Sequence, residues 1–424
     1  MKFNIITLGC KVNIYESEIM KQKLLDEGFV WTEDNADIVI VNTCSVTNMA
    51  DNKSKKMIRG ARKDNNNAIL VVCGCMAQNH QENLNDLDID ILIGNKDKSK
   101  IVELINNFIN TKEKYIKFYN NQKLEFEDMC VSEFKDHTRA FIKVQDGCNN
   151  FCSYCIIPYM RGNIRSKDIN KVVEEAKELV NNGHKEIVLT GIHTGSYGRG
   201  LDYDLVDLIE RMSEISGLDR IRISSIEVTE INDKFLNMLK NNNKVCNHLH
   251  IPLQSGSEEV LKLMNRKYNK EQFKNIIDKI REVRKDISIS TDVIVGFPSE
   301  TEEMFLECMD FCREINFSKI HVFPYSRREG TKACEIPNHL DNATKKDRSR
   351  RLISVSDELN RDYNSKFINQ VVNVLIEEVK DGKSIGHTSN YLRVIIDEEL
   401  VPNNEYDVVV TELYQESVKA KLHN

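Results

Sequence analysis

Short apolar runs alternate with amphipathic segments through most of this 424-residue chain, and that alternation limits its possible folds more than any other feature. Four apolar runs in residues 1–110 are predicted to be buried strands: NIITLGC, DIVIVNTC, AILVVCGC and IDILIG. Strands that lack a polar face and alternate with helices form parallel sheets covered on both sides. This region is therefore predicted to be an open parallel α/β sheet.

The alternation resumes after a connector, at about residues 110–135, that has no clear hydrophobic period. Six strand-like runs separated by helical patterns lie between residues 139 and 326. Because eight such units close a barrel, six predict a parallel sheet that curls into a partial (β/α)6 barrel.

A third arrangement is expected towards the C-terminus, where residues 341–367 are predicted to form one long helix. Four short strands joined by turns are predicted after it, at residues 371–379, 386–397, 406–413 and 417–422. Such a series favours a small antiparallel β-barrel of the OB-like type. We therefore expect three domains, at residues 1–112, 134–366 and 367–424.

Twelve cysteines are many for a chain that has no apolar run long enough to cross a bilayer. The N-terminus also lacks the apolar core of a signal peptide, so we expect a cytoplasmic protein without a membrane partner. Thiols stay reduced in that compartment, which leaves metal binding, catalysis or core packing as their roles. The net charge of −7 disfavours nucleic-acid binding by charge alone, although local basic patches can still recognise an RNA.

The most specific motif is DGCNNFCSYC, which places Cys148, Cys152 and Cys155 in a CxxxCxxC arrangement. It follows the first strand of the predicted barrel, on a loop where barrel active sites form. Three thiolates on one loop can hold three irons of a cubane 4Fe–4S cluster and leave the fourth iron open. The alternatives are structural zinc, which three ligands without a nearby fourth fit poorly, or buried cysteines.

A second group consists of Cys10, Cys44 and Cys75, which are spaced roughly thirty residues apart and end the first three predicted strands. In open α/β sheets these strand ends line the ligand crevice. Spacing alone makes metal binding and core packing about equally probable. Cys73 lies two residues before Cys75, and we interpret it as a packing residue.

The CxxxCxxC loop in a partial barrel resembles the radical S-adenosylmethionine (SAM) superfamily. Three segments also match, in order, the N-terminal signatures of the methylthiotransferases: TLGCKVNIYESE, NTCSVTNMADNKSKKMIRGARK and CGCMAQ. This resemblance covers nearly the whole chain. It implies two 4Fe–4S clusters: a radical SAM cluster on Cys148, Cys152 and Cys155, and an auxiliary cluster on Cys10, Cys44 and Cys75 that supplies or carries the inserted sulfur. SAM would be both the radical source and the methyl donor.

Several residues at the ends of the predicted barrel strands match the SAM-binding region of that family. Polar residues at strand ends also cap the next helix, so each is a weak signal alone. The resemblance implies that SAM is bound by Tyr154, Gly191, Ser225, Glu227, Gln254 and Gly296.

GCKVNIYES, TCSVTNMADNKS and GHTSNYLRV resemble the branch that converts N6-threonylcarbamoyladenosine beside the tRNA anticodon to its 2-methylthio derivative. The resemblance implies tRNA as substrate, a reductant such as flavodoxin, and an RNA-binding TRAM domain at residues 367–424. Residues 371–424 hold ten acidic and five basic side chains, which is not a basic RNA-gripping surface. The basic residues between Lys53 and Lys63 and between 345 and 351 are better electrostatic candidates.

Two other functions remain open from the sequence. The radical chemistry could act on a protein side chain, or the chain could be a non-catalytic RNA-binding protein whose thiols hold zinc. Iron and sulfide analysis separates the second from an enzyme. The oligomeric state is left open, and a monomer is compatible with the sequence.

Overall fold

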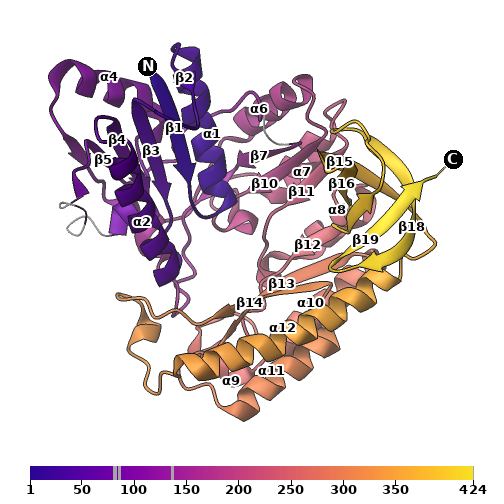
Figure 1. Cartoon of the computed structure of the whole chain (residues 1–424). Helices are drawn as coiled ribbons and strands as arrows, with labels where there is room; N and C mark the ends of the chain where they lie inside the picture. Colours follow the sequence, from indigo (N-terminus) through magenta and orange to yellow (C-terminus); the bar gives the residue numbers. More distant parts are fainter. Residues whose placement is uncertain (80–83, 85–86, 135–137, 424) are drawn as a thin grey trace.

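The computed structural model describes residues 1–79, 84, 87–134 and 138–423. Its first part is a six-stranded, all-parallel sheet with the strand order β2-β1-β3-β4-β5-β6 (Figure 1). The strands are β1 (Lys2–Thr7), β2 (Val30–Trp31), β3 (Ile38–Thr43), β4 (Ile69–Gly74), β5 (Ile91–Ile93) and β6 (Tyr115–Lys117). The predicted open parallel sheet is confirmed. The connector, for which no strand was predicted, contributes the short edge strand β6, whose partly exposed residues give no hydrophobic period.

Helices cover both faces of this sheet, so β3 and β4 are buried along their whole length. One face packs on α1 (Lys11–Asp26) and α4 (Ile101–Thr111). The other face packs on α2 (Asn48–Asp64) and α3 (Cys75–Asn79). The carboxyl ends of β1, β3 and β4 are therefore left between the two helical layers, where the crevice of such a sheet lies.

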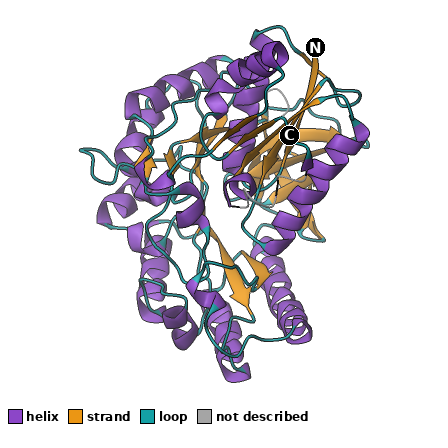
Figure 2. Cartoon of the chain, turned by 90° about the vertical axis from the view of Figure 1, so that its left-hand side faces the viewer, coloured by secondary structure: helices purple, strands orange, loops and turns teal. Residues whose placement is uncertain are grey.

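The central part is a partial barrel with helices on its outer side (Figure 2). Its six strands are β7 (Arg139–Lys143), β10 (Glu186–Thr190), β11 (Arg220–Ile223), β12 (His248–His250), β13 (Ser288–Val295) and β14 (Lys319–Pro324). They form two parallel three-stranded sheets, in the orders β11-β10-β7 and β12-β13-β14. The predicted six-stranded partial barrel is thus confirmed. The outer helices are α6 (Ile169–Asn181), α7 (Leu205–Ser213), α8 (Asp233–Asn241), α9 (Glu258–Leu263), α10 (Lys270–Val283) and α11 (Glu302–Ile315).

The long helix α12 (Asn342–Ser365) packs along β14 and leads to a closed five-stranded barrel. Its strands are β15 (Val371–Lys380), β16 (Lys383–Thr388), β17 (Arg393–Ile396), β18 (Glu405–Tyr414) and β19 (Ser417–Leu422). The order is β15-β16-β17-β19-β18, in which β17 and β19 pair in parallel and the other neighbours are antiparallel. The barrel prediction is confirmed.

One strand of that prediction was wrong, because residues 386–397 do not form a single strand. β16 ends at Thr388, and the chain turns back before β17 through Tyr391, whose φ is +67°. A left-handed backbone conformation is uncommon for a bulky residue and indicates that contacts with another part of the molecule hold it. Tyr391 indeed packs against the central barrel, a contact that no local pattern reveals.

The sheet and the central barrel meet at a set of five buried ionic side chains, which we call the charged seam: Glu16, Lys98, Lys143, Asp146 and Arg161. The Glu16 carboxylate pairs with Lys98, lies 2.7 Å from Lys143 Nζ and 3.1 Å from an Arg161 guanidinium nitrogen. Lys143 Nζ is also 2.7 Å from Asp146. All five side chains are at most 3% exposed, so these ion pairs are shielded from water.

Among the described residues, no helix is long and apolar enough to span a membrane.

Candidate functional site

The CxxxCxxC loop leaves the first barrel strand through a turn that requires glycine. Gly147 has φ +76°, and a Cβ atom at this position would lie 2.0 Å from the Asn163 carbonyl oxygen. The Cys155 N–H donates to the Cys152 carbonyl at 3.0 Å, which closes a tight turn within the loop. The loop thus brings Cys148, Cys152 and Cys155 close enough to interact electrostatically with one another.

The surroundings of these thiols favour ligation. Burial raises the pKa of Cys155 to about 12 and, against the opposing effect of Arg266, raises that of Cys152. Arg266 Nη1 donates to Cys152 Sγ at 3.4 Å, and His193 Nδ1 lies 3.8 Å from Cys148 Sγ. Buried thiols without a metal remain protonated, whereas a soft cation stabilises their thiolates. Three sulfur donors on one loop fit a cubane cluster with one open iron.

The second group of thiols follows three neighbouring strands, as the order of the sheet requires. Cys10 directly precedes α1, Cys44 directly follows β3, and Cys75 is the first residue of α3 after β4. A Cβ atom on Gly9 would lie 2.8 Å from Cys44 Sγ, so the backbone beside Cys10 approaches the Cys44 thiol closely. Burial raises the pKa of Cys44 to about 11. The structure therefore brings these three cysteines to one edge of the sheet.

Cys73 lies elsewhere. Its side chain has no exposed surface, it packs in the apolar layer beneath α1 and α4, and its Sγ is 3.7 Å from Asn42 Oδ1. This is the position of a core residue.

Arg161 is a site residue that sequence analysis missed. Its guanidinium donates to Asn13 Oδ1 at 2.9 Å and belongs to the charged seam, and it interacts electrostatically with Cys10 and Cys75. Its Nε is buried and has no hydrogen-bond partner among the described residues. The Arg161 guanidinium thus carries a positive charge and an unused hydrogen-bond donor beside two of the thiols. Both features suit a negatively charged group bound by Cys10, Cys44 and Cys75.

Among the described residues, no three His, Cys, Asp or Glu side chains are close enough to share a single metal ion. The ligands of a cubane cluster each bind a different iron, so they need no common point.

The candidate SAM residues occupy different positions at the barrel mouth. Glu227 pairs with Arg266, the residue that also contacts Cys152. The Tyr154 ring lies edge-on to Phe297, with centroids 6.4 Å apart. Gln254 and Gly296 have φ of +66° and +72°, and the Gly296 N–H donates to Glu300 at 2.8 Å. Gly191 and Ser225 instead line a large cavity.

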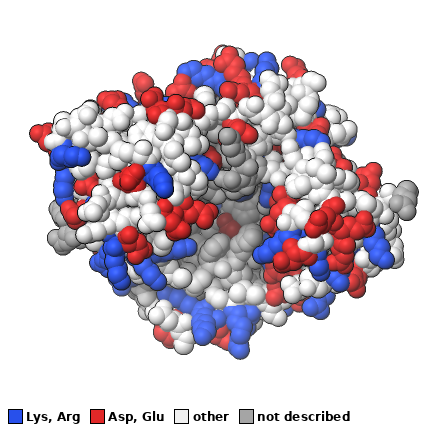
Figure 3. Space-filling view, turned by 45° about the horizontal axis from the view of Figure 1, so that its top comes forward, with Lys and Arg blue, Asp and Glu red and all other residues white. Residues whose placement is uncertain are grey.

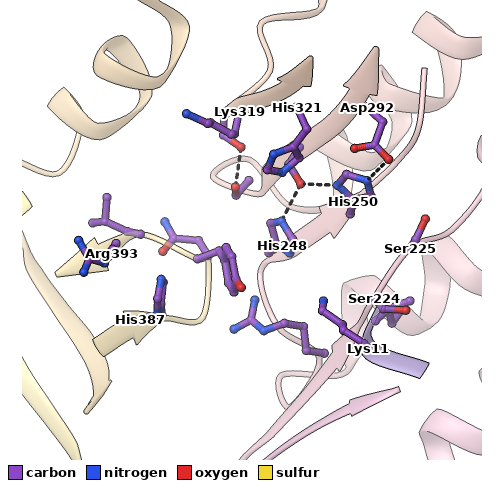
Figure 4. Close-up of a pocket in the computed structure, with 18 of the residues that line it drawn as sticks. Lys11, Ser224, Ser225, His248, His250, Asp292, Lys319, His321, His387 and Arg393 are labelled. Atoms are coloured by element: carbon purple, nitrogen blue, oxygen red, sulfur yellow. Dashed lines mark hydrogen bonds and ion pairs between the residues drawn. The ribbon is translucent and has the colours of Figure 1, made fainter. Parts of the chain in front are cut away.

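That cavity has a volume of about 1160 Å³ and receives residues from all three parts of the molecule (Figure 4). The sheet contributes Cys10 and Lys11 at the start of α1. The polar wall includes Ser224 and seven residues that sequence analysis did not identify: His248, His250, Asp292, Lys319, His321, His387 and Arg393. A cavity of this size beside Cys10, with polar side chains along one wall, can hold a modified nucleoside.

Tyr391 attaches the C-terminal barrel to this cavity. Its ring is stacked between His248 and His387, with centroid distances of 4.9 and 4.8 Å. The Arg222 guanidinium lies 4.7 Å from the same ring and is held by Glu186 at 2.6 Å. Burial lowers the pKa of His248 well below its ordinary value, so this imidazole stays neutral in the stack. These contacts fix the turn between β16 and β17 against the barrel.

Two basic surfaces were candidates for RNA binding, and their ion pairs distinguish them. On α2, Lys53, Lys56, Arg59 and Lys63 are exposed and, within the described part of the chain, have no carboxylate partner. At the start of α12, three arginines have partners: Arg348 with Glu300, Arg350 with Asp347, and Arg351 with Glu302. Figure 3 shows Lys and Arg side chains gathered below and to the left of a central hollow. The α2 surface has more positive charge available for phosphates.

Two family models match the chain. The model described as the radical SAM superfamily matches residues 142–312, and the one described as uncharacterized protein family UPF0004 matches residues 2–94. Among solved structures, the radical SAM methyltransferase TsrM from Kitasatospora setae superposes with a TM-score of 0.56 over 78% of this chain and 76% of that chain. Its sequence is 14% identical, so this likeness concerns the fold alone.

Curated relatives align along most of the chain. A Bacillus subtilis protein named threonylcarbamoyladenosine tRNA methylthiotransferase MtaB is 42% identical over 92% of this chain and 89% of its own length. A Thermotoga maritima protein of the same name is 38% identical over 92% of this chain and 90% of its own. The tRNA-2-methylthio-N6-dimethylallyladenosine synthase of Alkaliphilus oremlandii is 34% identical over 91% of this chain and 85% of its own.

Proposed function

Because this chain belongs to the radical SAM methylthiotransferases that act on tRNA, we propose that its substrate is N6-threonylcarbamoyladenosine beside the anticodon. The product is the 2-methylthio derivative. The names of the Bacillus and Thermotoga relatives support this branch. The observation that carries the proposal is the set of basic side chains in the cavity beside Cys10, among them Lys11 and Arg393, because the apolar group of the competing isopentenyl substrate offers them no anion.

The six site cysteines are proposed to hold two 4Fe–4S clusters. Cys148, Cys152 and Cys155 hold the radical SAM cluster, and Cys10, Cys44 and Cys75 hold the auxiliary one. When bound, SAM and these clusters would supply three things: the radical that activates the adenine carbon, the inserted sulfur, and the methyl group. The raised pKa values of Cys155 and Cys44 support one assignment each, and the orphaned Arg161 Nε beside Cys10 and Cys75 supports the auxiliary one.

The protein's own contribution is positioning. Arg266 donates to Cys152 Sγ and pairs with Glu227, which keeps that carboxylate at the barrel mouth. We propose that Glu227 binds SAM together with Tyr154, Gly191, Ser225, Gln254 and Gly296. The charged seam holds the two thiol groups in fixed relation, because Arg161 and Glu16 come from opposite sides of the boundary. The Tyr391 stack forms the part of the cavity wall that the C-terminal barrel contributes.

The partners follow from this chemistry. A low-potential reductant such as flavodoxin supplies electrons to the cluster on Cys148, Cys152 and Cys155, and the reaction takes place in the cytoplasm, where tRNA is available. The domains at residues 1–112, 134–366 and 367–424 act as cluster carrier, radical SAM barrel and RNA-binding module. The exposed cations of α2 support a first contact with tRNA there.

Nucleoside mass spectrometry tests the proposal. Transfer RNA is taken from bacteria that lack their own threonylcarbamoyladenosine methylthiotransferase, with and without this gene. We expect the 2-methylthio form with the gene and its loss in Cys148→Ala and Cys44→Ala. Unmodified threonylcarbamoyladenosine together with new 2-methylthio-isopentenyladenosine would assign the enzyme to the other tRNA branch instead.

A further inference from the structure

Lys11 is the first residue of α1, directly after Cys10, and its side chain reaches into the large cavity (Figure 4). The side chain is half-buried. The start of α1 carries neither a side-chain cap nor an acidic residue in its first turn. The positive end of the helix and the Lys11 ammonium therefore act on the same part of the cavity.

The arginines near Lys11 have carboxylate partners, whereas Lys11 itself has none among the described residues. Its ammonium lies near Tyr391 and Glu186, which favour its charge, and near the Arg139 and Arg222 guanidinium groups, which repel it. Arg139 is paired with Glu377 at 3.1 Å, and Arg222 with Glu186 at 2.6 Å. Across the described residues, Lys11 has neither a carboxylate within ion-pair distance nor a hydrogen-bond partner. A partly desolvated cation without a counter-charge is unfavourable unless a ligand provides one.

The acidic residues of the cavity do not meet this need. Asp292 is 3.2 Å from His250, and Glu416 is 2.9 Å from Lys319, so each already has a cationic or hydrogen-bonding partner. The cavity thus retains uncompensated positive charge at Lys11, beside a proposed ligand of the auxiliary cluster. Its occupant is expected to bring an anionic group to this wall.

We propose that Lys11 binds the carboxylate of the threonine moiety of the substrate and thereby selects an adenosine with an anionic N6 substituent. This inference rests on the proposed function, since the isopentenyl group offers no anion. An RNA phosphate could also satisfy the ammonium, but it would be present in every tRNA. The two sources therefore differ in whether binding depends on the substituent.

The test compares three anticodon stem-loops that carry adenosine, N6-threonylcarbamoyladenosine or its neutral methyl ester at the same position. Dissociation constants are measured anaerobically by fluorescence anisotropy with cluster-loaded enzyme, in the wild type and in Lys11→Met. A charged hydrogen bond that is lost to a neutral ester corresponds to a roughly 10- to 100-fold weaker affinity. The wild type should show this preference for the acid over the ester, and Lys11→Met should abolish it.

Two further variants serve as controls. Lys23→Met removes a cation from the other end of α1 and should keep the preference for the acid. Lys11→Arg should restore most of that preference, which shows that the charge matters and not only the fold. Iron content equal to that of the wild type shows that the clusters beside Lys11 are intact.

The competing outcomes are distinct. If the wild type binds the acid and the ester with equal affinity, Lys11 does not recognise the carboxylate. If Lys11→Met lowers the affinity for all three stem-loops to the same extent, the ammonium binds a phosphate, and the proposal is overturned as well. Methylthiolation of the acid stem-loop by the wild type is scored separately. Its absence overturns the proposed function, while the binding comparison still decides whether Lys11 recognises the carboxylate.

Discussion

Glu16 shows how much a single side chain can determine here, because its carboxylate has no exposed surface and contacts three cations. Breaking such a buried network by removing one partner costs about 3–5 kcal/mol. We expect Glu16→Gln to lower the free energy of unfolding by about this amount, measured by urea denaturation of the anaerobic protein. Glu27→Gln changes an exposed carboxylate at the end of the same helix and should leave the midpoint unchanged.

The same residue makes stability depend on pH. Burial alone would raise the pKa of Glu16, but Lys143, Lys98 and Arg161 lower it far below its ordinary value of 4.5. A carboxylate with a depressed folded-state pKa stabilises the protein above its unfolded pKa and loses this contribution as the pH falls. The stability difference between wild type and Glu16→Gln should therefore be full near neutrality and shrink below pH 4.5. A constant difference down to pH 3 would contradict the assignment.

The site cysteines give a stoichiometric prediction. If each group of three thiols holds one 4Fe–4S cluster, Cys148→Ala and Cys44→Ala should each lose about four of about eight irons per chain. Cys73→Ala should retain all of them, because that thiol lies in the apolar core. Iron and acid-labile sulfide assays after anaerobic reconstitution measure this directly. Loss of iron in Cys73→Ala would make Cys73 a ligand in place of Cys75.

At the scale of elements, the turn before the CxxxCxxC loop is the most sensitive point. A Cβ atom on Gly147 would lie 2.0 Å from the Asn163 carbonyl oxygen, in a backbone region that alanine avoids. Gly147→Ala should displace the loop and cost about four irons, with loss of SAM cleavage. Gly60→Ala, in the middle of α2 with open space around it, should stabilise the protein or leave it unchanged. Equal iron content in the two variants would show that the turn tolerates a side chain.

Elements with a strong local signal were predictable from the sequence. β3 and β4 are buried along their whole length and appear in the sequence as apolar runs. The spacing of Cys148, Cys152 and Cys155 indicated a cluster site, which stays a prediction. The two-residue strand β2 and the edge strand β6 carry too few buried residues to give a pattern.

The charged residues of the site could not be predicted in the same way. Glu16, Arg161 and Arg266 look like solvated helix or loop residues, because the partners that make them buried lie far away in the chain. Tyr391 was placed in a strand for the same reason: its turn is set by the rings of His248 and His387. Pairing between distant segments leaves no local signature.

At the scale of the whole molecule, the C-terminal barrel is acidic, and α2 is the surface that we propose for tRNA binding. We expect replacement of Lys53, Lys56 and Arg59 by Ala to weaken binding of all tRNAs alike. Each lost phosphate contact should also reduce the slope of log affinity against log salt by about one. A Lys346→Ala and Arg350→Ala double variant at the start of α12 should change both quantities less. Anisotropy titrations at several salt concentrations give the slopes, and equal slopes for the two sets would place the tRNA elsewhere.

The charged seam also limits how this architecture can be recombined. Lys143 and Arg161 of the barrel share two carboxylates, Asp146 of the barrel and Glu16 of the sheet. A chimera whose donor sheet lacks a carboxylate at this place would leave two buried cations to share Asp146 alone, at a cost of about 3–5 kcal/mol. The sheet and the barrel are therefore expected to be interchangeable between related proteins only as a matched pair.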